Sequence, residues 1–111
     1  MVEGGALDAF LALPRYLFTR AAIEYAPEEP GVYALFDASE LVYLGRAADR
    51  SGQSIRELLR LHQDGKLGAC TMKATHYTWE ISLWPAARET ELLVRYFQAH
   101  RRDPRCVPKA A

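Results

Sequence analysis

The chain has 111 residues, a length that suits a single domain. Half of them are hydrophobic and a quarter are charged, which allows a core and excludes a disordered or collagen-like chain. The formal net charge is zero, but residues 1–44 carry two basic and seven acidic side chains, whereas residues 45–111 carry twelve basic and seven acidic ones. A basic part in a neutral chain favours local, weak binding of a polyanion; an ordinary mixed surface is the alternative.

The N-terminus does not resemble a secretion signal, because Glu3 stands where a positive charge is expected. No apolar stretch is long enough for a membrane span. Cys70 and Cys106 are too few and too far apart for a disulfide scaffold or a CxxC pair. The spacing of Cys70, His62 and His76 matches no zinc module. We therefore expect reduced thiols in an intracellular, cytoplasmic protein.

Residues 6–25 are predicted to form a helical segment in two pieces. Apolar residues such as Phe10 recur at helical spacing, Pro14 ends or kinks the first piece, and the pattern continues to Ile23. Two prolines and a glycine then interrupt the chain before residue 32. Residues 1–26 are thus expected to be an N-terminal helical extension.

Two short runs of β-favouring residues follow, at 31–36 and 41–45, with the polar turn Asp37-Ala38-Ser39-Glu40 between them. This arrangement predicts a β-hairpin. Residues 75–83 alternate between β-favouring and other residues, which predicts a third strand.

Two further helices are predicted. Ser54 and Glu57 form a capping box at the start of one helix, and an apolar stripe that ends at His62 follows. Pro85 opens the last helix at its first position. The order of elements predicts an α+β fold with a small three-stranded antiparallel sheet, made of hairpin 31-36/41-45 and strand 75-83 and flanked by helices. Residues 27–106 form the main domain, and residues 107–111 are a tail.

The hairpin carries two short motifs. Gly31-Val32-Tyr33 begins its first strand and Tyr43-Leu44-Gly45 ends its second, so pairing can bring the two tyrosines onto one face of the sheet. In these motifs and their flanks, 30–35 and 42–47, the chain resembles the GIY-YIG nuclease superfamily. It is most similar to the N-terminal nuclease domain of the bacterial excision-repair excinuclease, over roughly residues 27–106. The resemblance implies a metal-dependent endonuclease that hydrolyses DNA phosphodiester bonds.

The resemblance also implies roles for four residues. Tyr33 would activate the attacking water and Tyr43 would help to position the phosphate. Arg56, in the first turn of the capped helix, would contact the scissile phosphate. Glu89 on the last helix would hold the single metal ion, Mg²⁺ or Mn²⁺.

The metal ligand has to be chosen between Glu89 and Glu91. At 100° per residue Glu89 lies within the apolar stripe of the last helix, whereas Glu91 points to roughly the opposite side. A carboxylate on an apolar face needs a partner, and a metal ion is one; Arg88, Arg56 or the helix amides are the alternative. In the family the glutamate is also followed by apolar residues three and four positions later, as Glu89 is.

Three other residues have two interpretations each. Arg46 follows the second motif and Arg60 lies one turn after Arg56, and both are candidates for phosphate binding or for an ordinary solvated surface. His62 is a possible member of the active site, but we favour a structural role in the core stripe.

The expected partner is DNA, bound weakly and with little sequence preference, with help from a partner protein or a homo-oligomer and with no role for a membrane. The alternative is a non-catalytic DNA- or protein-binding module on the same fold. The zero net charge favours it, and so does the extra length before the helix arginine, where Ser51-Gly52-Gln53 has the character of an insertion. A third interpretation is an α+β protein of unrelated function in which the two tyrosine motifs are coincidental.

Overall fold

The computed structural model describes residues 5–48 and 53–107. Residues 51 and 52 of the predicted insertion and residues 108–111 of the predicted tail therefore lie outside the described residues. Within the described part of the chain, no helix is long and apolar enough to cross a membrane.

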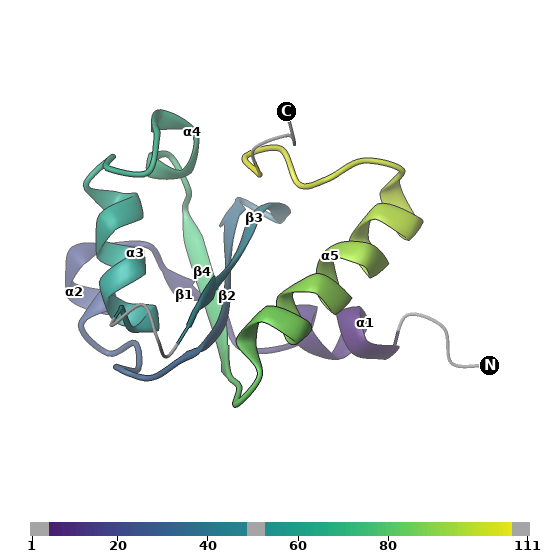
Figure 1. Ribbon diagram of the computed structural model, residues 1–111. Coiled ribbons are helices and arrows are strands. Elements are labelled where there is room, and N and C mark those ends of the chain that lie inside the picture. The colour runs from purple at the N-terminus through teal and green to yellow at the C-terminus, as the bar shows by residue number, and fades with distance from the viewer. Residues whose placement is uncertain (1–4, 49–52, 108–111) are drawn as a thin grey trace.

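An antiparallel sheet of four strands forms the middle of the molecule, in the order β1-β4-β2-β3. Its members are β1 (Tyr16–Leu17), β4 (His76–Ile81), β2 (Gly31–Asp37) and β3 (Glu40–Ala47). Helices α2, α3 and α4 lie on one side of the sheet and helices α1 and α5 on the other (Figure 1). This confirms the predicted α+β fold, with one strand more than expected.

The extra strand comes from the segment predicted to be helical. Helix α1 (Gly5–Leu11) ends before Pro14, and the chain then runs extended as β1, where Tyr16 pairs with Tyr77. Helix α2 (Arg20–Ile23) begins only after Thr19, whose side chain accepts a hydrogen bond from the Ala22 amide at 3.1 Å. In β1, backbone hydrogen bonds to the edge of β4 take the place of helical hydrogen bonds. The spacing of apolar residues in the sequence did not reveal this strand pairing.

The predicted hairpin is confirmed, and each of its strands is slightly longer than expected. Its register places Tyr33 opposite Gly45 and Leu35 opposite Tyr43. The turn between the strands holds Ala38 at a φ of 55°, a left-handed conformation that is uncommon for a residue with a side chain. Strand β4 pairs with the other edge of β2 and ends at Ile81, two residues before the predicted end.

The predicted helix starts are also confirmed. Ser54 caps α3 (Ile55–Gln63) by accepting a hydrogen bond from the Glu57 amide at 3.1 Å, and α5 (Pro85–His100) has its proline in the first turn. Between α3 and β4 lies α4 (Ala69–Met72), a single turn that the sequence analysis did not predict.

Each face of the sheet has its own core, because side chains alternate along a strand. Val32, Ala34 and Phe36 of β2 point toward α1 and α5, whereas Tyr33 and Leu35 point toward α2 and α3. The first core is built from apolar residues and a single tyrosine: Leu7, Phe10, Val32, Ala34, Phe36, Leu41, Leu44, Leu92 and Tyr96. The second contains the candidate site.

Candidate functional site

The two motif tyrosines lie together on the α3 side of the sheet. Their ring centroids are 6.0 Å apart, and their hydroxyl groups interact. Tyr33 is almost fully buried, at 2% exposure, whereas Tyr43 is partly exposed. The sequence prediction that both rings share one face is therefore correct, and Tyr43 is the member of the pair that solvent can reach.

Both motif glycines are explained by close approaches. A Cβ atom on Gly45 would lie 2.8 Å from the Tyr33 hydroxyl oxygen and 2.7 Å from the Tyr43 ring, so the tyrosines pack over this position because it has no side chain. A Cβ atom on Gly31 would collide with the backbone of β4 at Glu80. The glycine of the second motif thus leaves room for the site, and the glycine of the first motif allows β2 and β4 to pair.

His62 of α3 is the third aromatic member of the site. Its Nε2 lies 2.8 Å from the Tyr33 hydroxyl, and its ring centroid is 4.6 Å from that of Tyr43. Its Nδ1 lies 2.8 Å from Oγ1 of Thr71 on α4. A neutral imidazole has one donor and one acceptor nitrogen, so these two hydrogen bonds satisfy both. His62 therefore lies in the core, as favoured from the sequence, and also contacts the tyrosine pair.

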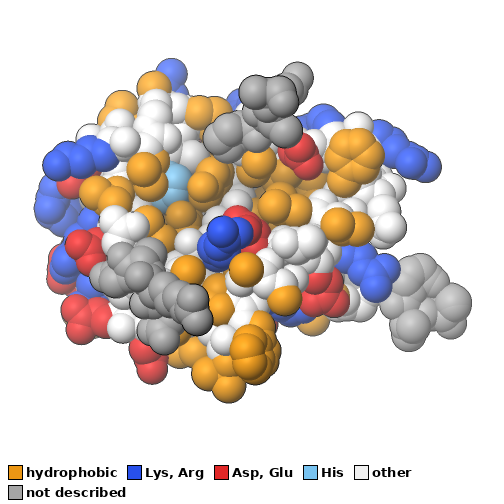
Figure 2. Space-filling view, viewed as in Figure 1, with side chains coloured by type: hydrophobic (Ala, Val, Ile, Leu, Met, Phe, Trp, Pro, Cys, Tyr) orange, Lys and Arg blue, Asp and Glu red, His pale blue; other side chains and the backbone are white. Residues whose placement is uncertain are grey.

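Glu89 approaches the same cluster from α5, which lies on the opposite side of the sheet from α3 (Figure 1). Arg46, at the end of β3, donates a hydrogen bond to Oε1 of Glu89 at 2.8 Å. The carboxylate acts electrostatically on both Tyr33 and Tyr43. In the middle of the molecular surface that Figure 2 shows, between β3 and α5, a basic and an acidic side chain lie side by side, with apolar side chains around them. Glu91, two residues further along α5, pairs instead with Arg88.

Burial dominates the acid–base properties of the site. It raises the pKa of Tyr33 far above its ordinary value, and the neighbouring Tyr43 phenol and the Glu89 carboxylate add to the effect. Burial also raises the pKa of Tyr43, and Glu89 raises it further, but the hydrogen bond from Tyr33 and the charge of Arg46 lower it. Burial lowers the pKa of His62 to about 4. At neutral pH all three rings are therefore uncharged.

The two arginines of α3 lie elsewhere. Nε of Arg56 donates to the Ala26 carbonyl at 2.8 Å, and its NH1 pairs with Glu28 at 2.9 Å, so its guanidinium is held by the loop before β2. Arg60 pairs with Glu24 at 2.7 Å on the same side. The structure thus brings together Tyr33, Tyr43, Glu89, Arg46 and His62, and it places Arg56 and Arg60 away from them.

Glu89 is the carboxylate that this cluster offers to a metal ion. Among residues 5–48 and 53–107, no group of three or more His, Cys, Asp and Glu side chains is arranged to hold a metal. Mg²⁺ commonly binds through one or two protein carboxylates and takes its other ligands from water and substrate phosphate. A single carboxylate, with water and substrate as the other ligands, fits that kind of ion.

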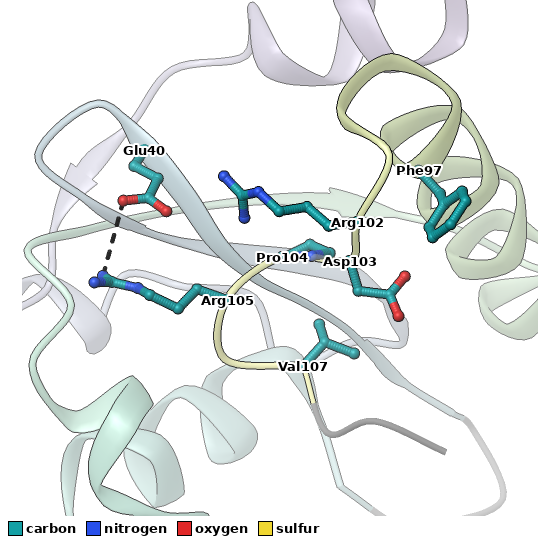
Figure 3. Close-up of a pocket in the computed structure, with 7 residues that line it drawn as sticks. All are labelled: Glu40, Phe97, Arg102, Asp103, Pro104, Arg105 and Val107. Atoms are coloured by element: carbon teal, nitrogen blue, oxygen red, sulfur yellow. Dashed lines mark ion pairs between the residues drawn. The ribbon is translucent and has the colours of Figure 1, made fainter.

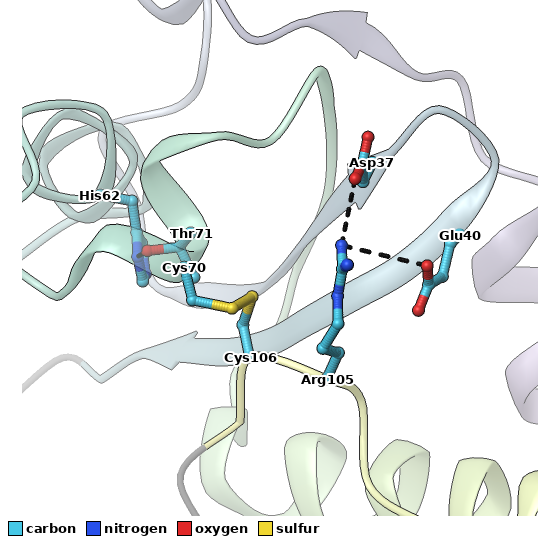
Figure 4. Close-up of a disulfide and its surroundings, with 7 residues drawn as sticks. All are labelled: Asp37, Glu40, His62, Cys70, Thr71, Arg105 and Cys106. Carbon is cyan, nitrogen blue, oxygen red and sulfur yellow. Dashed lines mark hydrogen bonds and ion pairs between the residues drawn. A yellow bond between two sulfur atoms is a disulfide. The ribbon is translucent and has the colours of Figure 1, made fainter.

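The prediction of reduced cysteines is wrong. The structure joins Cys70 of α4 and Cys106, which lies beyond α5, in a disulfide with Cα atoms 5.6 Å apart (Figure 4). Their separation of 36 residues concealed the pairing, because the segment after α5 folds back over the β2–β3 hairpin toward α4 (Figure 1). On the way Arg105 pairs with Asp37 at 3.1 Å.

A separate groove of about 580 Å³ lies between the end of α5 and this returning segment (Figure 3). Phe97 and Val107 form apolar parts of its wall, and Arg102 points toward Glu40. The groove includes none of the tyrosine cluster, so we do not assign the candidate chemistry to it.

Sequence reasoning missed two contacts of the site. Thr71 was not considered, although a buried histidine on an apolar helix face implies that a polar partner must exist. For Glu89 the expected partner was a metal ion, with Arg88, Arg56 or the helix amides as the alternative, and the pairing with Arg46 was not foreseen. A signal for this pairing was available, because Arg46 lies on the same strand as the second motif, two residues after Leu44.

No protein-family model matches the chain, and a comparison with curated proteins gives no significant match.

Proposed function

We propose that this chain is a GIY-YIG-type nuclease domain that hydrolyses DNA phosphodiester bonds at the cluster of Tyr33, Tyr43, Glu89 and Arg46. One observation carries the proposal. Two tyrosines from neighbouring strands, a carboxylate from α5 and a histidine from α3 meet at one place, although they are spread over residues 33–89. A resemblance limited to the motifs does not require this convergence, whereas a working site does.

The two tyrosines differ in exposure to solvent and therefore have different roles. Tyr43 is the partly exposed ring, so its hydroxyl contacts the attacking water or a phosphate oxygen. Tyr33 is buried between Tyr43 and His62, bonds His62 through its hydroxyl and packs beside the Tyr43 ring, which it would hold in place. Because the pKa of both phenols is raised, they act as neutral hydrogen-bonding groups at neutral pH rather than as phenolates.

Glu89 would hold a Mg²⁺ or Mn²⁺ ion, which when bound stabilises the leaving oxygen and withdraws charge from the phosphate. Arg46 would bind the non-bridging phosphate oxygens, for which its partly exposed guanidinium turns from Glu89 toward the substrate. The proposal gives this role to Arg46 rather than Arg56, because Arg56 is held by Ala26 and Glu28.

The test is cleavage of a labelled DNA containing duplex, single-stranded and branched parts, with Mg²⁺ or Mn²⁺ and with chelator. We expect Glu89→Gln to lower the rate by orders of magnitude, because the ion loses its protein ligand. Glu91→Gln is the matched control two residues away and should leave the rate unchanged. Cleavage that survives chelation, or equal losses in both variants, contradicts the proposal.

A second pair of variants tests the phosphate contact. Arg46→Gln should lower kcat by about 100-fold, the usual cost of removing one group that stabilises transition-state charge. Arg56→Gln should leave kcat nearly unchanged at temperatures where it is folded. A larger loss of kcat in Arg56→Gln than in Arg46→Gln would assign the phosphate contact to Arg56.

Binding without cleavage is the second candidate, and one observation favours it. A phosphate-binding arginine on α3 would have to lie on the helix face toward the tyrosines. One turn before His62, that face carries Leu58, which packs against the core, and not an arginine. If this candidate is correct, the chain binds DNA weakly and with a shallow salt dependence, and neither metal ion supports cleavage.

A further inference from the structure

A continuous run of buried contacts leads from Tyr33 to the disulfide. The Tyr33 hydroxyl bonds His62 and His62 bonds Thr71, at 2.8 Å each, and Tyr33, His62 and Thr71 are all at most 2% exposed. Thr71 is the residue after Cys70. The half of the bridge on α4 is thus one residue from the group that orients the His62 ring (Figure 4).

The other half of the bridge is fixed to the second tyrosine strand. The amide of Cys106 donates to the Val42 carbonyl at 2.7 Å, and Val42 precedes Tyr43 on β3. The bridge therefore connects α4, which holds Tyr33 through His62, with the strand that carries Tyr43.

Helix α4 is too short to be stable by itself. It is one turn of four residues, and Gly65 and Gly68 before it have φ angles of 77° and 108°. A single helical turn has little stability of its own, and two glycines in left-handed conformations make the segment before it adaptable. Opening the bridge leaves α4 with fewer constraints on the position of Thr71.

We propose that the Cys70–Cys106 bridge is a redox-sensitive positioning device that holds Thr71, and through it His62 and Tyr33, in the active arrangement. The effect on cleavage rests on the proposed nuclease function; the effect on the Tyr33–His62–Thr71 contacts does not. A protein that acts on DNA inside a cell meets a reducing pool of thiols, where disulfides are typically transient and redox-sensing. Cys70 is exposed, so such a thiol can reach it.

The chemistry of opening is thiol–disulfide exchange. A thiolate of a dithiol reductant attacks Cys70 Sγ, the sulfur–sulfur bond breaks, and Cys106 leaves as a thiolate that takes up a proton. The second thiol of the reductant then displaces Cys70, which also leaves as a thiolate and is protonated. The bridge gains two electrons and two protons, and the dithiol becomes a disulfide. Oxidation reverses the exchange.

The direct test follows the His62 imidazole by nitrogen NMR in the air-oxidised protein and after dithiothreitol, with mass spectrometry to count free thiols. His62→Gln assigns the signal among the three histidines. We expect one fixed tautomer in the oxidised form, and averaged tautomers with a higher titration midpoint after reduction. An unchanged His62 signal after complete reduction, or free thiols in the air-oxidised protein, overturns the proposal.

Two matched variants separate positioning from general loss of packing. Thr71→Val removes the hydroxyl that bonds His62, and Thr78→Val removes another buried hydroxyl, which donates to the Pro14 carbonyl at 2.7 Å. Thr71→Val should reproduce the reduced His62 spectrum in the oxidised protein, and Thr78→Val should not. Identical spectra for the two variants contradict a positioning role.

The cleavage assay then connects the device to function. Reduction should lower the rate about 10-fold, and the Cys70→Ser/Cys106→Ser double variant should be equally slow and insensitive to dithiothreitol. Cleavage unaffected by reduction overturns redox control. If neither form cleaves but the His62 signal responds to reduction, the nuclease proposal fails and the positioning of Tyr33 stands.

Discussion

The two faces of the sheet are built from the same strands but have different interiors. Toward α1 and α5, Val32, Ala34 and Phe36 meet apolar side chains. Toward α3, Tyr33 of the same strand meets His62, which in turn bonds the buried Thr71. Alternation along one strand therefore separates a mainly apolar core from a core that holds the buried tyrosine and histidine, whereas Glu89 comes to this cluster from α5.

Buried polar groups occur on both faces: on the α1 and α5 side Thr78, which pairs with Ala34, donates a hydrogen bond to the Pro14 carbonyl at 2.7 Å. A buried polar group is unfavourable unless it has a hydrogen-bond partner. Among the described residues, no buried side-chain nitrogen or oxygen lacks such a partner. The α3 face is therefore a connected set in which the loss of one group leaves another unsatisfied.

The largest effect on stability is expected on the apolar face. Phe10→Ala removes a side chain that is 1% exposed, which should lower the free energy of unfolding by about 3–5 kcal/mol through lost burial and a cavity. Urea unfolding measures it. Leu17→Ala, at a position that is 59% exposed, is the control and should change little. Equal effects at both positions contradict the assignment of this core.

An intermediate effect is expected at His62, and it depends on pH. Burial lowers its pKa to about 4 from an ordinary value near 6.5, so between these values the unfolded chain holds a proton that the folded chain does not. Stability from this group is thus complete above about pH 6.5 and is lost as the pH falls toward 4, by about 3 kcal/mol in all.

Urea unfolding at several pH values tests this dependence. His62→Gln should be less stable than the wild type at pH 7 and should lose less stability on acidification. His100→Gln, at an exposed position, should keep the wild-type dependence. A parallel loss in all three proteins would show that His62 does not titrate as described.

The smallest effect on stability should accompany a large effect on cleavage. Tyr33→Phe removes the hydroxyl that bonds His62 and should cost about 1–3 kcal/mol, because a buried acceptor or donor is left unpaired. Tyr77→Phe removes a comparable hydroxyl, which donates to the Ala22 carbonyl at 2.7 Å. We expect similar stability for both and loss of cleavage in Tyr33→Phe alone. Equal activity would place the chemistry outside the tyrosine pair.

The sequence predicted the local features well because they depend on neighbouring residues. The hairpin, the Ser54 cap and the Pro85 start follow from turn and capping chemistry within a few positions. Helical periodicity also separated Glu89 from Glu91, and the two carboxylates have different partners, Arg46 and Arg88; the metal-binding role of Glu89 stays a prediction.

What the sequence did not reveal depends on how distant segments meet. Tyr16 pairs with Tyr77 although more than half of the chain lies between them, a contact that local propensity does not encode. The placement of Arg56 is set by the loop that holds Ala26 and Glu28 beside the first turn of α3. The Cys70–Cys106 pairing likewise requires the return of the chain after α5.

The hydrogen bond from Cys106 to Val42 also protects an edge of the sheet. Strand β3 is the last strand in the order, and a long edge strand with open backbone groups invites pairing with another molecule. The segment after α5 covers part of that edge, and the bridge to Cys70 keeps it there. Loss of the bridge therefore uncovers a template for intermolecular β-pairing, so the same two sulfur atoms that position a hydroxyl group also restrain aggregation.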